Sequence, residues 1–303
     1  MANENGEMVL PTVLIHYGSF EPLWQQPGLI QAGPHMEEGP TAIQLRPVSI
    51  PALVSKLSSR HWNGRGVLLH YTDPFIIRAM QLKGISHWPG PKILACGDLH
   101  HGPQPIETLT AYQEAERHDS VLLTFNPHLL PQVRNAMKVP VRCLAPTFFR
   151  YPSAKRSTQP KLQLLHVGSI GPNHPKRREV VQTLLKQKTV PFRHTTTNNA
   201  EEAAQLYAEY ALVLNIPLNQ DLNHRCFEIM AAETPQIIFG NRNLIGDLQY
   251  LRNRPDLLWT QSIKELERLV EYLFANQQKL ANIKVAPAPY WDFQNLIKHA
   301  LMP

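Results

Sequence analysis

The segment "NQDLNHRCFEIMAAETPQIIFGN", residues 219–241, sets Asp221, Arg225 and Glu228 among largely apolar residues. At about 100° per residue, a helix through this segment would place all three on one narrow arc. In one interpretation they form ion pairs on a solvated face, each stabilising the helix by a few tenths of a kcal/mol. In the other, Glu228 accepts hydrogen bonds from vicinal sugar hydroxyls and Arg225 binds a phosphate through two parallel hydrogen bonds. Spacing alone leaves both open.

A second polar stretch, "LLHVGSIGPNHPKRRE" (164–179), is typical of a strand, a glycine turn and the start of a helix. Its candidate ligand-binding residues are Gly168, Ser169, Gly171, Lys176 and Arg177. Glycines let backbone N–H groups approach an anion, and a helix N-terminus adds a favourable partial charge. Basic residues in a first turn oppose the helix dipole, so local helix stability does not account for them. A bound diphosphate would account for them; the alternative is a solvated basic patch after a common turn.

In the first half of the chain, "ACGDLHHG" (95–102) carries the groups most suited to proton transfer. Asp98, His100 and His101 follow a predicted strand, where a parallel sheet places its ligands. Any of them could act as a general base and take a proton from an attacking hydroxyl. Alternatives near other strand ends are His70 and Asp73 in "LLHYTDP" and the Gly18 turn in "IHYGSFE".

Apolar runs rich in β-branched residues alternate with amphipathic segments along almost the whole chain. The predicted strands lie at 12–18, 66–71, 92–98, 120–125, 139–146, 162–168, 190–197, 211–217 and 236–239. The predicted helices lie at 50–59, 74–84, 106–118, 126–137, 176–187, 200–210, 262–283 and 291–302, with one more ending near Ala232. Continuous apolar strands separated by helices are typical of parallel sheets covered on both faces. The pattern predicts two Rossmann-like, doubly wound α/β domains facing each other across a cleft.

The segment "RYPSAKRSTQPK" (150–161) interrupts this alternation with prolines, hydroxyl residues and basic residues, as an interdomain linker would. The predicted organisation is a first domain at 1–150, a linker at 151–161 and a second domain at 162–285. A C-terminal helix at 286–303 could pack back on the first domain. Ligands of open α/β sheets bind beyond the carboxyl ends of the strands, so a cleft between two such domains suits two substrates.

The composition is that of a folded protein that favours anionic partners. The chain has 303 residues, 43% of them hydrophobic, and a formal net charge of +6. Its three cysteines are widely spaced and predict neither a disulfide framework nor a zinc site. Without an apolar run of about 18 residues or a basic secretory start, we expect no transmembrane segment and a cytoplasmic location.

Together, the two polar stretches resemble the GT-B glycosyltransferases, particularly the CgeB-like group within the glycosyltransferase group 1 families. The matching segments are "HVGSIGPNHPKRRE" and "LNHRCFEIMAAETPQII", so the resemblance is specific over about 162–240 and loose over the N-terminal half. It implies that the first domain binds an acceptor and that the second binds a nucleotide-diphosphate sugar. It also implies that Glu228 contacts the ribose hydroxyls, that Arg225 and the 168–178 loop lie near the diphosphate, and that Asn223 belongs to the donor site.

The same resemblance implies transfer of a sugar to a glycan, a small molecule or a protein, with no cofactor. A tightly bound divalent metal is not expected, because helix N-termini and basic residues stabilise the leaving diphosphate in this group. Two positions depart from the family pattern. Gln220 stands where many relatives have Glu, which concerns recognition of the sugar, and Glu233 replaces a turn glycine, which could alter the backbone near the donor.

Three other functions are compatible with parts of the sequence. "GDLHHG" also opens the metal-binding pattern of dinuclear phosphoesterases, but the further motifs of that class are missing. The positive charge and the basic linker fit a DNA-modifying glycosyltransferase of the phage type. The Gln220 departure fits a non-catalytic protein of the same fold that binds a nucleotide or glycan.

Overall fold

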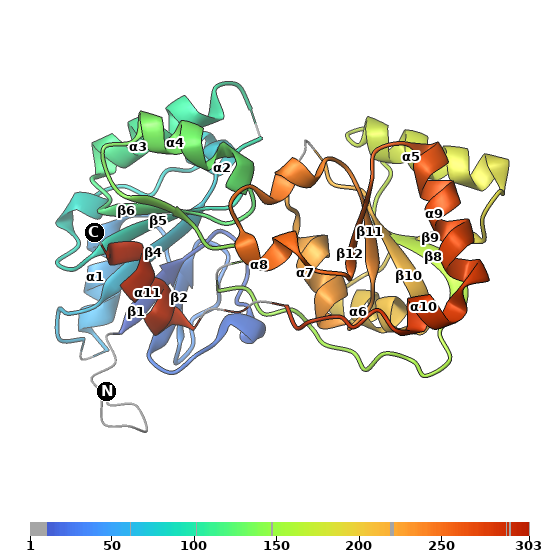
Figure 1. Cartoon of the computed structure of the whole chain (residues 1–303). Coiled ribbons are helices and arrows are strands. Elements are labelled where there is room, and N and C mark those ends of the chain that lie inside the picture. Colours follow the sequence, from blue (N-terminus) through green and yellow to red (C-terminus); the bar gives the residue numbers. More distant parts are fainter. Residues whose placement is uncertain are drawn as a thin grey trace. The chain divides into compact units, whose positions relative to one another are not determined.

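The computed structural model describes residues 11–60, 62–100, 102–146, 148–218, 221–288, 290 and 292–302. The chain folds into two compact units (Figure 1). The N-terminal unit comprises Met1–Phe149 with Tyr290–Pro303, and the C-terminal unit comprises Arg150–Pro289. None of the helices in the described part of the chain is long and apolar enough to cross a membrane.

The described residues of the N-terminal unit form a seven-stranded parallel sheet in the order β3-β2-β1-β4-β5-β6-β7. Its strands are β1 (Thr12–Ile15), β2 (Leu29–Gly33), β3 (Ala42–Gln44), β4 (Val67–Thr72), β5 (Lys92–Cys96), β6 (Ser120–Leu123) and β7 (Val141–Cys143). Its α-helices are α1 (Ile50–Ser58), α2 (Pro74–Ala79), α3 (Pro105–Glu116), α4 (Leu130–Ala136) and α11 (Phe293–Leu301). The chain runs from β1 outward to β3 and then returns to β4 on the other side of β1. The two halves of the sheet therefore meet between β1 and β4, as in a doubly wound fold.

Two strands of this sheet, β2 and β3, were not predicted from the sequence. β2 contains Gln31, which interrupts the apolar run although its side chain is fully buried. The amide of Gln31 is satisfied by His16 and by the backbone of Glu21, so burial leaves it hydrogen-bonded. β3 is only three residues long, too short for a periodic pattern to show.

The described residues of the C-terminal unit form a five-stranded parallel sheet in the order β12-β11-β10-β8-β9. Its strands are β8 (Lys161–Val167), β9 (Phe192–Thr195), β10 (Tyr210–Asn215), β11 (Gln236–Phe239) and β12 (Leu257–Thr260). Its α-helices are α5 (Pro175–Gln187), α6 (Ala200–Glu209), α7 (His224–Ala231), α8 (Gln249–Arg252), α9 (Ile263–Ala275) and α10 (Gln277–Ala281). The two halves of this sheet meet between β8 and β10. Both units thus have the predicted doubly wound α/β architecture.

Strand alternation gives the C-terminal sheet two apolar faces. Leu164, Leu212 and Leu214 pack in one core with α5 and α9. Leu165 and Val213 point to the opposite face and pack with α6 and α7. Figure 1 shows these helix pairs on the two sides of the sheet. Helices on both faces of the sheet can therefore contact the segment at the end of β8.

The long helix predicted near the end of the C-terminal unit and the segment 150–161 have features that the sequence pattern does not show. The helix predicted over 262–283 ends at Ala275 and restarts as α10, because Asn276 leaves the helical conformation (φ −115°, ψ 58°). The segment predicted as a linker is hydrogen-bonded to the C-terminal unit. Arg156 donates to the carbonyl oxygens of Ala211 (3.1 Å) and Glu233 (3.3 Å).

Two histidines in the core of the N-terminal unit, His70 and His118, should make its stability depend on pH. Their rings stack at 5.8 Å, and both side chains are almost fully buried. Burial lowers the pKa of His70 to about 3 and the pKa of His118 well below its usual value. The unfolded chain therefore binds protons that the folded chain excludes, and stability is lost as the pH falls below 6.5. Each histidine should contribute up to about 1.4 kcal/mol per pH unit in that window.

Thermal unfolding followed by circular dichroism between pH 7.5 and pH 5 would measure this effect. His118→Phe should make the pH dependence shallower, because neither ring nitrogen of His118 has a hydrogen-bond partner among the described residues. His87→Gln serves as the control, because His87 is exposed. Equal slopes in the wild type and in His118→Phe would contradict the assignment.

Candidate functional site

The first turn of α7 is held by a network of amide side chains at the end of β10. Asn223 accepts the backbone N–H of Cys226 (3.2 Å), and it exchanges two hydrogen bonds with Asn215 (3.1 and 3.2 Å). Asn215 also donates to the buried Gln236, which in turn donates to the carbonyl oxygen of Cys226 (2.8 Å). A buried, satisfied network of this kind fixes the start of the helix. Asn223, predicted as a donor-binding residue, is thus also the residue that caps α7.

The position of this cap changes one part of the sequence-based interpretation. Because α7 begins at His224, Asp221 lies before the helix and is not on one helical arc with Arg225 and Glu228. Asp221 is buried, with 8% of its surface exposed. The predicted arc is therefore wrong for Asp221, whereas Arg225 and Glu228 do share the helix.

The guanidinium group of Arg225 lies against the backbone of Gly168, the residue that follows β8. A Cβ atom on Gly168 would come within 2.4 Å of Arg225 Nη2, and the φ of Gly168 is +136°. Glycine is therefore needed here both for its conformation and for the space that the guanidinium occupies. Arg225 Nε and Nη1 are buried and have no hydrogen-bond partner among the described residues. Such donors are costly to leave unsatisfied, which favours an external acceptor.

Glu228 lies one turn further along α7 and is partly buried rather than on a solvated face. Tyr207 of α6 donates its hydroxyl to Glu228 Oε2 at 3.5 Å. Burial raises the pKa of Glu228, with Arg225 and Tyr207 opposing the shift, and burial raises the pKa of Tyr207 to about 12. Gly168, Arg225 and Glu228, which the sequence analysis assigned to one site, are thus joined on the face covered by α6 and α7.

Two of the three basic residues at the start of α5 bind the unit's own backbone. Arg177 is buried and donates to the carbonyl oxygens of Ser169 (3.1 Å) and Ile216 (3.1 and 3.3 Å). Arg178 donates to the carbonyl oxygen of Ile170 (3.0 Å). Ser169 and Ile216 follow β8 and β10, so Arg177 bridges the two strands at the point where the halves of the sheet meet. A structural role therefore accounts for these two charges without a ligand.

The glycine turn after β8 is also fixed by contacts of its own. Ser169 accepts the backbone N–H of Gly171 at 3.2 Å, and His194 Nε2 is hydrogen-bonded to the carbonyl oxygen of Gly168 at 2.9 Å. These contacts hold the turn in place. The side chain of Ser169 is exposed to solvent.

Lys176 lines a separate pocket of about 450 Å³ on the side of the sheet covered by α5. Its Nζ lies over the ring of Phe239, 5.8 Å from the centroid. Asn173, Asn241 and Gln261 supply polar groups to the same pocket. The predicted donor-binding residues therefore divide into two groups, one around Arg225 and one around Lys176.

In the N-terminal unit, Asp98 and His100 follow β5, at the carboxyl edge of the sheet. Asp98 Oδ1 accepts the backbone N–H of His100 at 2.7 Å, and the ring of His100 stacks on that of His128 at 6.0 Å. Asn126 accepts the N–H of Leu99, which fixes this loop to the segment that follows β6. The third predicted residue, His101, lies outside the described residues. The described part of the chain contains no group of three or more His, Cys, Asp or Glu side chains placed to hold a metal ion.

The alternative proton-transfer candidates have structural roles. His70 is fully buried and pairs with the Tyr17 hydroxyl at 3.3 Å. Asp73 caps α2 by accepting the N–H of Ile76 at 2.9 Å. Full burial shields His70 from a substrate hydroxyl, whereas Asp73 and Asp98 are both only partly buried.

Sequence reasoning missed Tyr207 and His194, which contact Glu228 and Gly168. Their partners are 21 and 26 residues away in the chain, so no local spacing marks them. Glu233, by contrast, was identified from the family pattern, and its φ of +54° is the left-handed conformation that the usual glycine would adopt. The turn after α7 therefore keeps its backbone in spite of the substitution. Gln220, the other departure, lies outside the described residues.

Two Rossmann-like units, each with a parallel doubly wound sheet, define the GT-B fold of glycosyltransferases, and known structures share it. HepE of Anabaena, solved in complex with UDP and glucose, superposes with a TM-score of 0.58 at 10% identity, over 96% of this chain and 95% of HepE. Sucrose-phosphate synthase of Thermosynechococcus elongatus gives 0.50 at 13% identity, over 91% and 92% of the two chains. TarM gives 0.53 at 12% identity over 82% of this chain, which spans only 55% of TarM.

The family comparison agrees with the fold. Residues 152–288 match the family described as glycosyl transferase-like. This range contains Gly168, Arg225 and Glu228, and the match confirms the resemblance to GT-B glycosyltransferases. A comparison with curated protein sequences found no match. The family match covers most of the C-terminal unit, and the solved structures share the fold.

Proposed function

We propose that this protein transfers a sugar from a nucleoside-diphosphate donor, bound by the C-terminal unit, to an acceptor hydroxyl. The observation that carries the proposal is Arg225. Its guanidinium lies against Gly168, and the buried atoms Nε and Nη1 have no acceptor among the described residues. A diphosphate would supply oxygen acceptors for these donors with charge-assisted hydrogen bonds.

The residues around Arg225 suit the other parts of such a donor. Glu228, one turn along α7, would accept hydrogen bonds from the two ribose hydroxyls. Ser169 and the backbone N–H groups of Ser169 and Ile170, together with Asn223, would contact the phosphates from the side of β8, because the N–H groups of Gly168 and Gly171 already donate to Thr195 and Ser169. Lys176 and Arg177 act differently in this proposal: Arg177 positions the turn, and Lys176 adds positive charge from its own pocket.

On the acceptor side, we propose Asp98 or His100 as the group that removes the proton of the attacking hydroxyl. Asp98 is oriented by its bond to the His100 N–H, at the strand end where ligands of parallel sheets bind. Positive charges and the backbone N–H groups would stabilise the leaving diphosphate, with no cofactor and no divalent metal required.

A thermal-shift panel of UDP, GDP, CDP, ADP and dTDP tests donor binding. One of them, at 100 times its Kd, should stabilise the protein by roughly 2.7 kcal/mol. Repeating the measurement in EDTA should leave the shift unchanged. The corresponding nucleotide sugar should then be hydrolysed slowly without an acceptor, which a protein that only binds nucleotides would not do. If none of the five raises the melting temperature, the proposal is wrong.

A further inference from the structure

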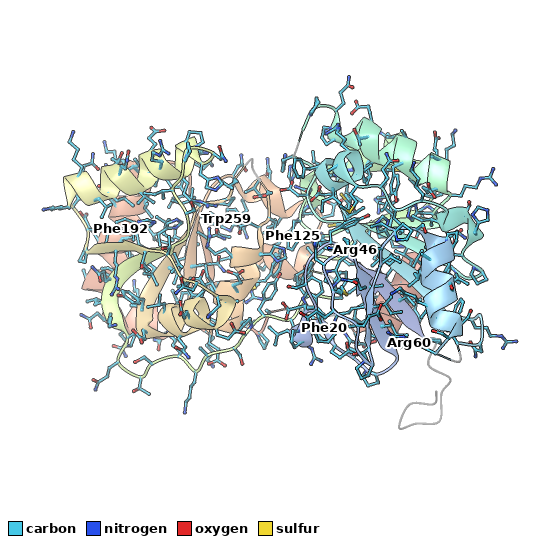
Figure 2. All side chains as sticks on the ribbon, turned by 180° about the vertical axis from the view of Figure 1, so that it is seen from behind. Phe20, Arg46, Arg60, Phe125, Phe192 and Trp259 are labelled. Atoms are coloured by element: carbon cyan, nitrogen blue, oxygen red, sulfur yellow. The ribbon has the colours of Figure 1, made fainter. Side chains whose placement is uncertain are left out.

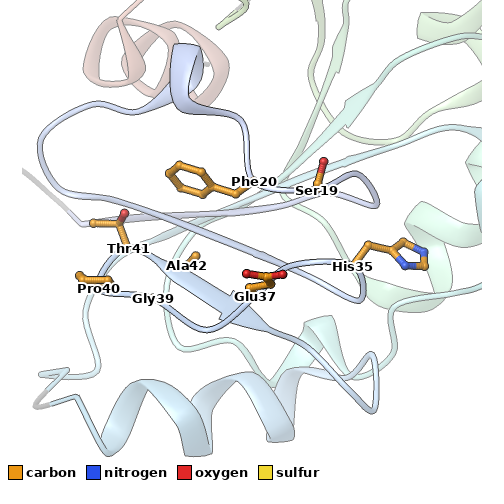
Figure 3. Close-up of a pocket in the computed structure, with 8 residues that line it drawn as sticks. All are labelled: Ser19, Phe20, His35, Glu37, Gly39, Pro40, Thr41 and Ala42. Atoms are coloured by element: carbon orange, nitrogen blue, oxygen red, sulfur yellow. The ribbon is translucent and has the colours of Figure 1, made fainter.

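A pocket of about 390 Å³ lies in the N-terminal unit beside the edge strand β3 (Figure 3). One wall is the segment after β1, which contributes Ser19 and Phe20. The facing wall is the crossover between β2 and β3, residues 34–41, which contributes His35, Glu37 and Thr41. Figure 3 shows the Phe20 ring above this crossover and the Glu37 carboxylate opposite it. The volume is in the range of small-ligand sites, about 300–1,000 Å³.

The wall that carries Phe20 is fixed from beneath by a buried side chain. Gln31 is fully buried; its Oε1 accepts the backbone N–H of Glu21 at 3.0 Å, and its Nε2 donates to the Glu21 carbonyl oxygen at 2.9 Å. Glu21 follows Phe20 directly in the chain. The buried polar residue in β2 therefore has a purpose beyond the sheet, because it holds the aromatic wall of the pocket in place.

The facing wall contains turns and an isolated bridge but no helix or strand, and it is fixed by two arginines, both labelled in Figure 2. Arg60 donates to the carbonyl oxygens of Gly39 (2.7 Å) and Ala42 (3.1 Å), and Arg46 donates to that of Pro34 (2.8 Å). Arg60 also forms an ion pair with Glu38, but neither guanidinium group binds the lining side chains His35, Glu37 and Thr41. A loop held at both ends in this way is preorganised for a ligand.

The charges around the pocket indicate the kind of ligand. Glu38 is paired with Lys56 and with Arg60 (2.6 Å), so its carboxylate is neutralised by cations, and none of these three groups is among the residues found to line the pocket. Glu37 is exposed and has no hydrogen bond or ion pair among the described residues. No Lys or Arg is among the residues found to line the pocket. An anionic ligand would therefore meet a carboxylate and no cation.

We propose that this pocket binds a saccharide unit. A sugar ring presents an apolar C–H face that would pack on Phe20, and vicinal hydroxyls that would donate to the Glu37 carboxylate. Ser19, Thr41 and His35 can both donate and accept hydrogen bonds to the remaining hydroxyls. The site is distinct from the donor site of the C-terminal unit and does not depend on it, so the protein would hold a second sugar besides that of its donor.

Saturation-transfer NMR with methyl α-glucoside, methyl α-galactoside, N-acetylglucosamine and choline tests the proposal. At least one sugar should receive saturation from the protein, and Phe20→Ala should abolish the signal. Glu37→Gln should weaken binding about tenfold, since it removes the charge-assisted hydrogen bonds. Because Glu37 is exposed, this variant should fold even if Phe20→Ala does not.

Phe75→Ala is the matched control, because Phe75 is 62% exposed on α2 and lies outside the pocket lining. It should bind the sugar like the wild type, and Glu37→Gln should keep its thermal shift with nucleoside diphosphates. Binding of choline alone would instead indicate a site for cations, and no saturation of any sugar, or equal loss in Phe75→Ala, would likewise overturn the proposal.

Discussion

Replacing Arg225 with Ala should weaken nucleoside-diphosphate binding about 100-fold, a loss of about 2.7 kcal/mol. The reason is that two buried donor atoms of this side chain have no acceptor in the described part of the protein, and a bound diphosphate would supply one. Truncation removes those bonds together with the charge that a diphosphate requires. Isothermal titration with the nucleotide that gives the largest shift in the panel measures the effect.

Arg252→Ala in the same unit is the matched control. Arg252 is 46% exposed and pairs only loosely with Asp247 at 3.6 Å, and such surface pairs contribute little. Its affinity should equal that of the wild type. Arg225→Lys separates charge from geometry, because a lysine cannot form the two parallel bonds of a guanidinium. Wild-type affinity in Arg225→Ala would exclude the diphosphate from this position.

Gly168→Ala tests the contact between Gly168 and the Arg225 guanidinium by changing Gly168 instead of Arg225. The added Cβ would lie 2.4 Å from Arg225 Nη2, on a residue whose φ of +136° disfavours side chains. We expect this variant to lose affinity by displacing the guanidinium, although it removes no polar group. If the two residues act as one unit, the double variant Gly168→Ala/Arg225→Ala should lose no more affinity than Arg225→Ala alone, whereas additive losses would contradict this.

The architecture could be predicted because the pattern that defines it is local. Runs such as "ALVLNIP" and "KRREVVQTLLKQ" show a strand or a helix within ten or so residues, and their alternation dictates a parallel doubly wound sheet. The sequence pattern did not predict β2 and β3, because neither strand shows a pattern within its own residues. Gln31 is buried because of partners elsewhere in the chain, and three residues are too few to show a period.

The candidate site was predictable only in part, and the reason is again the range of the contacts. Arg225 and Glu228 share one helix, and the glycine turn follows one strand, so each motif could be found by its spacing. What Arg177 does depends on the carbonyl oxygen of Ile216, 39 residues away, and nothing near Arg177 indicates that contact. Three adjacent basic residues that look alike in the sequence therefore have different roles in the structure.

Glu228 supplies the last prediction, a pH dependence of donor binding. Burial raises the pKa of its carboxyl above 4.5, and only the ionised form can accept hydrogen bonds from both ribose hydroxyls with full strength. The ionised fraction is complete above the raised pKa and falls as the pH is lowered through it. Affinity for the nucleoside diphosphate should therefore decline on acidification, starting at a higher pH than an exposed glutamate would give. Titrations between pH 7.5 and pH 5 would follow the decline.

The variants separate this effect from protonation of the ligand, whose terminal phosphate has a pKa near 6. Glu228→Gln should bind about tenfold more weakly than the wild type at pH 7.5 and should show only the ligand's own pH dependence. Tyr207→Phe removes the hydroxyl that donates to Glu228 Oε2, a bond that holds the pKa of Glu228 down. In that variant the decline should move to higher pH. If Glu228→Gln and the wild type lose affinity in parallel as the pH falls, Glu228 does not titrate in contact with the donor, and its place at the ribose must be given up.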